Sequence, residues 1–241
     1  AESRGPCGEK SARRSAFRVF DALRQPRQTL TNPVSHDLPP ALFARLDESD
    51  DAAFYAAPRF VVHIDEATIA ALTQWYGEVL APGAEVLDLM SSWVSHLPDA
   101  AALPLGRVVG LGMNGAELAA NPRLASFDVM DLNAAPRLPY PDAAFDAVLC
   151  AVSVQYLTRP FAVFAEVARV LRPGGRVAIA TSHRCFPTKA IRAFHELPPR
   201  DRLAMIALYL ERAGGFAAAE LVDRSPPGAD PLWIVTARRA S

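Results

Sequence analysis

The sequence has little of several features that would narrow its function at once. Its 241 residues include three cysteines, Cys7, Cys150 and Cys185, which are too few for a disulfide framework and share no metal-ligand spacing. The formal net charge is -1, so bulk charge gives no reason to expect nucleic-acid binding. No run approaches the roughly 18 consecutive apolar residues of a membrane-spanning helix. These absences predict no metal site, no nucleic-acid partner and no membrane span, and they favour a reducing compartment.

The opening of the chain differs in composition from the rest. Residues 1–27 hold seven Lys or Arg against three acids, and residues 29–51 carry several prolines before the acidic cluster DESDD at 47–51. We expect residues 1–60 to form an extended N-terminal arm, first basic and then acidic, and residues 61–241 to form one domain. The Arg- and Ser-containing start is typical of a transit-peptide remnant, which predicts an organelle, mitochondrion or chloroplast. A flexible basic tail on a cytoplasmic protein is the alternative.

Predicted strands and helices alternate along the domain. About half of the residues, 51%, are hydrophobic, which is enough for one large core. Helical spacing predicts a helix that starts after Asp65, and further helices over 115–120, 161–171 and 200–212. Apolar runs predict strands near residues 85–90, 107–111, 124–129, 145–152, 176–181, 216–222 and 232–237. This order predicts an α/β fold with a doubly wound, mostly parallel seven-strand sheet and an antiparallel edge strand.

The loop after the first strand, residues 91–96, reads SSWVSH and contains no glycine. In open α/β sheets ligands bind outside the carboxyl ends of the strands, so this loop is the expected place for chemistry. Glycine is the usual residue wherever the backbone must approach a ligand closely. His96 lies in this loop, and its ordinary pKa of about 6.5 makes it a candidate general base.

Two later strings carry a family resemblance. Residues 138–148 read LPYPDAAFDAV, and residues 166–176 read EVARVLRPGGR. In order and spacing they resemble the class I S-adenosylmethionine-dependent methyltransferases of the small-molecule, type 11 kind, and the similarity covers roughly residues 69–237. The resemblance implies a Rossmann-like fold, S-adenosylmethionine as the cofactor, and methyl transfer to a small molecule.

The resemblance also implies roles for individual residues. Asp88 matches the acid that ends the first strand and holds the ammonium group of the cofactor. Asp131 and Leu132 match the acid and the backbone that meet the adenine ring. The acid that binds the ribose falls on Gly112, so Asn114 is the candidate replacement. The remaining candidates are Ser91, Ser92, Trp93 and Ser153 for the cofactor, and His96 and Tyr156 for taking the proton of the acceptor.

The glycine-rich loop of the family is lost here, and two interpretations of the loss stay open. Met90, Ser92 and Val94 stand where three glycines would lie. In the first interpretation, serine hydroxyls replace backbone donors and Trp93 walls a remodelled cofactor site. In the second, Trp93 and Met90 fill the pocket, and the domain is a catalytically inactive scaffold or accessory subunit whose arm binds protein partners. An enzyme should show an open cleft between the two acids, and a scaffold should show that space blocked by Trp93.

Overall fold

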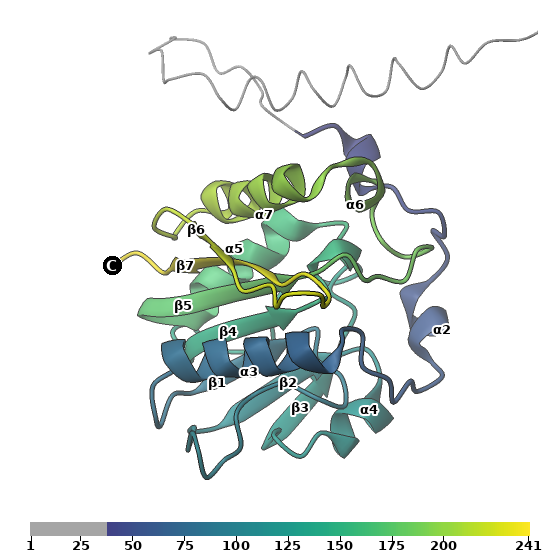
Figure 1. Cartoon of the computed structure of the whole chain (residues 1–241). Coiled ribbons are helices and arrows are strands. Elements are labelled where there is room, and N and C mark those ends of the chain that lie inside the picture. The colour runs from purple at the N-terminus through teal and green to yellow at the C-terminus, as the bar shows by residue number, and fades with distance from the viewer. Residues whose placement is uncertain (1–37) are drawn as a thin grey trace, which may run out of the picture.

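The structure, a computed structural model, describes residues 38–241 (Figure 1). The basic run at residues 1–27, and with it the predicted transit-peptide remnant, lies outside the described residues. One seven-stranded sheet has the strand order β3-β2-β1-β4-β5-β7-β6. β7 pairs antiparallel with both of its neighbours, and the other neighbouring strands pair parallel. The predicted fold, mostly parallel with antiparallel pairing at one edge, is therefore confirmed.

The seven strands lie close to their predicted positions. They are β1 (Val86–Leu89), β2 (Val108–Gly112), β3 (Ser126–Val129), β4 (Phe145–Ala151), β5 (Leu171–Thr181), β6 (Glu220–Asp223) and β7 (Trp233–Arg238). β5 starts earlier than predicted because Leu171 already pairs with Phe145, ahead of an irregularity in the register. The central strand β4 is almost entirely buried, as its continuous apolar composition predicts.

Helices cover both faces of the sheet (Figure 1). On one face, α3 (Glu66–Val79) packs in a core cluster with alternate residues of β1, β2 and β4. It begins as predicted, because the Asp65 side chain accepts a hydrogen bond from the Thr68 backbone N–H at 2.8 Å. On the other face, α5 (Pro160–Val170) and α7 (Pro199–Ala213) share the second core cluster. Among residues 38–241, no helix is both long and apolar enough to cross a membrane.

Several short helices complete the fold. α4 (Gly115–Ala120) follows β2 as predicted. The sequence did not predict four elements of three to five residues: η1 (Pro40–Phe43), α2 (Asp51–Tyr55), η2 (Val154–Tyr156) and α6 (Arg192–Glu196). They are too short for a helical repeat of apolar residues to be visible.

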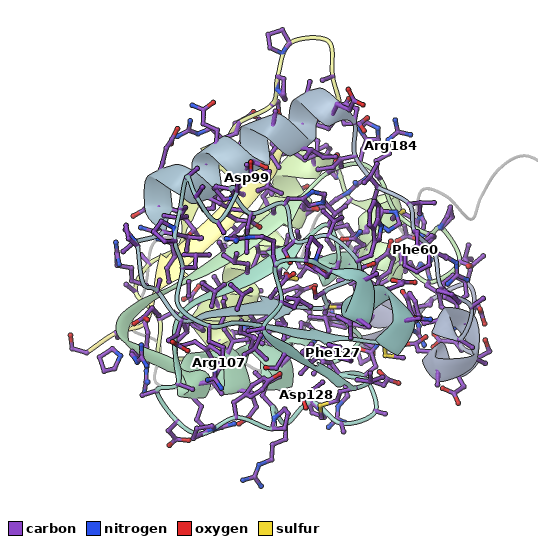
Figure 2. All side chains as sticks on the ribbon, turned by 90° about the horizontal axis from the view of Figure 1, so that it is seen from below. Phe60, Asp99, Arg107, Phe127, Asp128 and Arg184 are labelled. Carbon is purple, nitrogen blue, oxygen red and sulfur yellow. The ribbon has the colours of Figure 1, made fainter. Side chains whose placement is uncertain are left out.

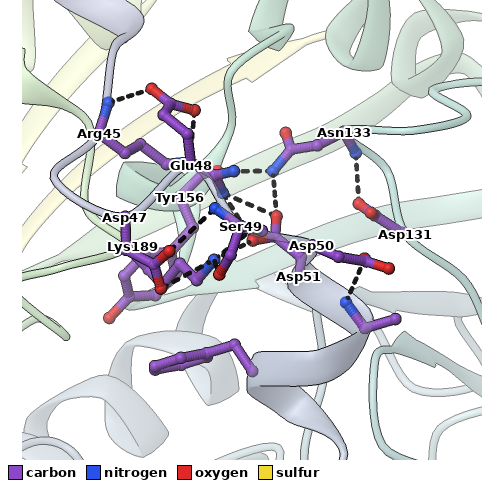
Figure 3. Close-up of polar contacts among 12 residues, drawn as sticks. Arg45, Asp47, Glu48, Ser49, Asp50, Asp51, Asp131, Asn133, Tyr156 and Lys189 are labelled. Atoms are coloured by element: carbon purple, nitrogen blue, oxygen red, sulfur yellow. Dashed lines mark hydrogen bonds and ion pairs between the residues drawn. The ribbon is translucent and has the colours of Figure 1, made fainter.

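The described part of the predicted arm, residues 38–60, packs against the domain. Leu42 belongs to the core cluster of α5 and α7. The side chain of Lys189 has no exposed surface, and its ammonium lies 3.2 Å from Asp47 and 3.1 Å from Asp51 (Figure 3). A buried ammonium is tolerated only when it is paired in this way. The acidic cluster therefore binds the arm to the loop before α6, while the predicted boundary near residue 60 stays a prediction.

Large exposed apolar side chains gather at two places. Phe127 and Val129 lie on the edge strand β3, where they are 39% and 58% exposed. Phe60 and the following two valines lie in the segment that leads from α2 to α3, with roughly half of each side chain exposed. Figure 2 shows Phe60 and Phe127 among the outer side chains of the molecule. The patch at Phe60 is the one that adjoins the candidate site.

Candidate functional site

One large cavity opens at the carboxyl ends of β1 to β4, where the loop analysis predicts it. It holds about 1150 Å³ of space, including the part open to solvent. The structure brings together nine of the ten predicted site residues around this cavity: Asp88, Ser91, Ser92, His96, Asn114, Asp131, Leu132, Ser153 and Tyr156. Within residues 38–241, no group of three or more His, Cys, Asp or Glu side chains is placed to hold a metal ion.

Asp88 lines the cavity at the end of β1 and is 3% exposed. Its Oδ2 accepts hydrogen bonds from the hydroxyls of Ser91 and Ser95, each at 2.6 Å. Burial raises the pKa of this carboxyl to about 6, because removal of water disfavours the charged form; the two serine hydrogen bonds act in the opposite direction. A positively charged group in the cavity would stabilise the carboxylate, so the site is suited to a cationic ligand.

Side-chain hydrogen bonds hold the glycine-free loop in place. The Ser92 hydroxyl donates to Glu117 Oε2 at 2.6 Å, which ties the loop to α4. Asn121 Nδ2 donates to the Ser92 carbonyl and to the Ser95 hydroxyl, both at 2.9 Å. The serine hydroxyls thus fix the position of the loop by donating to protein carboxylates, whereas the first interpretation of the sequence has them replace backbone donors in the cofactor site.

The backbone around the cavity adopts a conformation that disfavours side chains. Met90, His96 and Val152 line the cavity and have φ values of 57°, 53° and 51°. For a residue with a Cβ this left-handed region costs roughly 1–2 kcal/mol. Strain of this kind concentrates at functional sites, where the surrounding structure enforces it. Met90, which stands where the family has its first glycine, therefore adopts a backbone conformation that glycine favours.

Gly112, at the end of β2, has no room for a side chain. A Cβ on this residue would lie 2.2 Å from the carbonyl oxygen of Ser91. The loop after β1 crosses directly over the end of β2, in the space that an acidic side chain at this position would need. The absence of the ribose acid from the sequence is thus a consequence of the path of this loop.

Asn114, the candidate replacement for that acid, is already engaged. Its Oδ1 accepts from the backbone N–H groups of Ala116 and Glu117 at the start of α4. Its Nδ2 donates to the carbonyls of Tyr55 and Ala56 at the end of α2. The side chain caps one helix and holds the other, so its geometry does not favour a role as the ribose acceptor.

Glu117 is a carboxylate of the cavity that the sequence analysis did not single out. Oε1 accepts from the Arg59 backbone N–H at 2.7 Å, and Oε2 accepts from Ser92. Glu117 lies three residues after the helix cap Asn114, and this spacing indicates the start of a helix. It gives no sign that Glu117 binds a ligand. Its position beside Gly112 in the wall of the cavity makes it the better candidate for ribose hydroxyls.

Trp93 does not line the cavity. Its indole Nε1 donates to the carbonyl oxygen of Val61 at 2.9 Å, and its ring meets Phe60 edge-on with centroids 6.3 Å apart. The side chain therefore packs against the segment between α2 and α3. The scaffold interpretation required Trp93 to block the cavity, and Trp93 does not block it. Trp93 does not form a wall of the cavity either, as the first interpretation expected.

Asp131 and Leu132 directly follow β3 and line the cavity. In the strand order, β2 separates β3 from β1, the strand that carries Asp88. Asp131 Oδ1 accepts from the Asn133 backbone N–H at 2.8 Å, which forms a tight turn. Leu132 is buried and Met130 is partly buried, so both add apolar surface next to the carboxylate. The arrangement suits a flat heterocycle with a polar edge.

Residues of the predicted arm and of the segment that directly follows it form another wall. Asp51, Tyr55, Arg59 and His63 all line the cavity, together with Phe186 from the loop after β5. The rings of Tyr55 and His63 meet Phe186 edge-on, with centroids at 6.4 Å and 5.1 Å. Asp51 is bound by Arg45, Asn133 and Lys189, so its charge is compensated (Figure 3). No sequence motif marks this wall, because its partners lie far apart along the chain.

The two predicted proton acceptors differ in their surroundings. Burial, and to a smaller extent the nearby His63, lowers the pKa of His96 to about 4, so its imidazole is neutral at physiological pH. His96 Nδ1 is buried and has no hydrogen-bond partner among the described residues. The Tyr156 hydroxyl accepts from the Phe186 backbone N–H at 2.8 Å, and burial raises its pKa to about 12. The geometry favours His96 over Tyr156 as the group that accepts a proton.

Comparison with known proteins agrees with the resemblance stated above. Residues 92–179 match a family described as a methyltransferase domain. The chain is 35% identical over 92 residues to the O-methyltransferase resE of Aspergillus sclerotiorum, which covers 36% of this chain and 34% of that protein. It is 49% identical over 45 residues to the 27-O-demethylrifamycin SV methyltransferase of Amycolatopsis mediterranei, which covers 19% of this chain and 16% of that protein. These matches span about a third or less of the relatives' own length.

Solved structures share the fold over most of the chain. The [4+2]-cyclase SpnF has a TM-score of 0.53 at 20% identity, covering 70% of this chain and 80% of that chain. Phosphoethanolamine N-methyltransferase 2 of Haemonchus contortus, solved with S-adenosyl-L-methionine, has a TM-score of 0.51 at 15% identity, covering 72% and 52%. At such identities the likeness shows the fold alone. Together with the family match over residues 92–179, it supports the resemblance to the class I S-adenosylmethionine-dependent methyltransferases.

Proposed function

We propose that this chain transfers a methyl group from S-adenosylmethionine to a small molecule. The observation that carries the proposal is the open cavity of about 1150 Å³ whose wall includes both Asp88 and Asp131. The match of residues 92–179 to a methyltransferase-domain family and the printed names of the relatives support the reaction class. The scaffold alternative needed a cavity blocked by Trp93, and no observation favours it.

The residues around the cavity fit this cofactor. Asp88 offers a buried carboxylate to the cationic amino-acid end, and Glu117 offers carboxylate oxygens to the ribose hydroxyls. Asp131 and the apolar side chains of Met130 and Leu132 suit the adenine ring. When bound, the cofactor supplies an electrophilic methyl group attached to a positively charged sulfur. The hydroxyl-bearing side chains Ser91, Ser92 and Ser153 line the same cavity.

The chain contributes positioning and proton transfer. Holding the acceptor next to the cofactor in a fixed geometry supplies much of the rate of such a displacement. The neutral imidazole of His96 accepts the proton of the acceptor. Because its pKa of about 4 makes it a weak base, hydroxyl groups that are themselves acidic, those of phenols and enols, suit it best. The relative from Aspergillus sclerotiorum is named an O-methyltransferase, which supports an oxygen acceptor.

The arm and the loop after β5 supply the acceptor side. Tyr55, His63 and Phe186 present aromatic surface to the cavity, and such surface packs well against a flat conjugated molecule. The Arg59 guanidinium lies 4.6 Å from the centre of the Phe54 ring and also lines the cavity. We therefore place a planar phenolic or enolic acceptor between the arm and the cofactor.

Calorimetry with S-adenosylhomocysteine, the demethylated product, tests the cofactor half of this proposal. Wild type should bind, and Asp131→Asn should bind roughly tenfold or more weakly, because a hydrogen bond to a charged group contributes about 1.5–3 kcal/mol. Asp128→Asn, three residues earlier on β3 and outside the cavity, is the matched control and should bind like wild type. Absence of heat up to millimolar ligand, or equal affinities for all three proteins, overturns the proposal.

The acceptor half is tested with labelled S-adenosylmethionine and a panel of phenols and enols. His96→Ala should lower kcat strongly for any acceptor found, with cofactor affinity unchanged. An unchanged kcat would remove His96 from the reaction.

A further inference from the structure

A second cavity lies outside the proposed methyl-transfer site, between the loop after β5 and the start of α7. It holds about 480 Å³ of space, including the part open to solvent, and none of its lining residues lines the larger cavity. Its lining consists of Ser182, His183, Arg184, Cys185, Phe194, His195 and Arg202. Within the part of the chain that the structure describes, no carboxylate lines it. Its lining therefore presents hydrogen-bond donors and basic side chains, and any carboxylate that pairs with them lies outside the lining.

Arg202 is the charged group that lacks compensation. Its Nε donates to the Leu197 carbonyl at 2.8 Å, and its guanidinium carbon lies 5.9 Å from the centre of the Phe194 ring. No Asp or Glu among residues 38–241 forms an ion pair with it, and burial lowers its pKa. A partly buried guanidinium is costly without an anion, and its planar fork matches the oxygens of a carboxylate or phosphate.

The neighbouring basic side chains Arg184 and His183 have a carboxylate partner, which sets Arg202 apart. Arg184 Nε lies 3.0 Å from both carboxylate oxygens of Asp230. His183 Nε2 lies 3.2 Å from Oδ1 of the same aspartate. Asp230 therefore pairs with two of the basic side chains in the lining. Arg202 has no carboxylate partner among residues 38–241.

Ser182 provides a second, independent observation. The residue lines the cavity and is 4% exposed, and its hydroxyl has no hydrogen-bond partner among the described residues. Most buried hydroxyls in folded proteins have a partner. A ligand with acceptor oxygens would satisfy this hydroxyl as well as the guanidinium.

We propose that this second cavity binds an oxyanion, a phosphate, sulfate or carboxylate group, through the guanidinium of Arg202 and the hydroxyl of Ser182. The anion is either free in solution or part of a larger organic ligand. Phe186, which follows the lining residues in the same loop, belongs to the wall of the larger cavity. The two cavities therefore share the loop after β5 in their linings.

The test uses calorimetric titration of the full chain with inorganic phosphate and with phenyl phosphate, at constant ionic strength balanced with sodium chloride. Wild type should bind phosphate, and Arg202→Gln should weaken binding by about tenfold or more, as expected for loss of a charge-assisted bidentate contact. Arg202→Lys, which keeps the charge and loses the fork, should be intermediate. Arg200→Gln removes an exposed arginine of the same helix outside the cavity, so it is the matched control and should bind like wild type. Tighter binding of phenyl phosphate than of inorganic phosphate identifies an organic ligand, and equal or weaker binding identifies a free anion.

Two results would overturn the proposal: no phosphate binding by wild type up to tens of millimolar, or equal binding by wild type and Arg202→Gln. Because Arg202 also holds the Leu197 carbonyl, the variants are checked by thermal melting without phosphate. If Arg202→Gln does not fold, phosphate titration of wild type followed by amide NMR decides instead: shifts at residues 182–185 support the site, and their absence refutes it. Affinity for S-adenosylhomocysteine should be the same in all variants, so failure here is distinct from failure of the methyltransferase proposal.

Discussion

Asp88→Asn is expected to stabilise the folded chain at neutral pH while it weakens cofactor binding. The wild-type carboxyl is buried, and its pKa in the folded chain is about 6, against about 3.9 when unfolded. The folded state therefore holds the proton more tightly than the unfolded state does. Stability from this group is fully present below about pH 4 and is lost as the pH rises through about 6.

The size of the effect follows from the difference in pKa. One unit corresponds to about 1.4 kcal/mol, so a difference of about two units lowers the unfolding free energy by about 3 kcal/mol between pH 4 and pH 7. Asparagine carries no charge, and its oxygen can still accept the hydroxyls of Ser91 and Ser95. Its amide N–H groups then lack an acceptor, at a cost of about 1–3 kcal/mol. The net gain at neutral pH should be about 1 kcal/mol.

Urea denaturation of both proteins at about pH 4.5 and about pH 7.5 measures the effect. The difference between wild type and Asp88→Asn cancels the contributions of all other titrating groups. That difference should shift in favour of the variant as the pH rises. If it is the same at both values, Asp88 is not held at a raised pKa, and the argument from its burial is wrong. Weaker binding of S-adenosylhomocysteine by the variant would show that the carboxylate serves the ligand at the expense of stability.

Three further substitutions test other parts of the structure. Lys189→Met should lower the unfolding free energy by about 3 kcal/mol, because it breaks a buried ion pair. This value is the lower end of the usual range, since Asp51 keeps its contacts with Arg45 and Asn133. The substitution should also speed proteolysis within residues 44–60, whereas Arg192→Met, at an exposed pair, should do neither. Gly112→Ala should cost about 1–3 kcal/mol in urea denaturation, because its Cβ would meet the Ser91 carbonyl; Gly77→Ala, on the open surface of α3, should be neutral or stabilising, and equal effects would contradict the close contact. Met90→Gly should be about 1 kcal/mol more stable than Met90→Ala, because both lose the same packing and glycine alone relieves the positive φ; the reverse order would show that the left-handed conformation is absent in solution.

The main frame of the fold could be predicted from the sequence because its signals are local. β4 is a continuous apolar run, and α3 has its capping Asp65 and its apolar spacing within one stretch. The position of the cavity follows from the rule for the carboxyl ends of parallel strands. Asp88 and Asp131 then lie around it by topology alone.

The other half of the site depends on contacts between distant residues. The acidic cluster of the arm is bound by Lys189, which no local pattern connects to it. The orientation of the Trp93 side chain depends on its hydrogen bond to the carbonyl oxygen of Val61. Because every residue carries a backbone carbonyl, no sequence pattern identifies this partner. In the sequence, Gly112 indicates only that the acid expected to bind the ribose is missing. The structure shows that the loop after β1 leaves no room for a side chain at this position. Such pairings are invisible to periodicity and spacing.

The wall formed by Tyr55, Arg59 and His63 lies before residue 92, where the family match begins. This wall precedes β1, whereas the acids that would hold the methyl donor, Asp88, Glu117 and Asp131, lie from β1 onward. Substitutions in a short stretch ahead of the sheet can change the shape of the acceptor side without disturbing the register of any strand. Two proteins with nearly the same sheet can therefore differ in the acceptor that they would methylate, and a comparison limited to residues 92–179 would miss the difference.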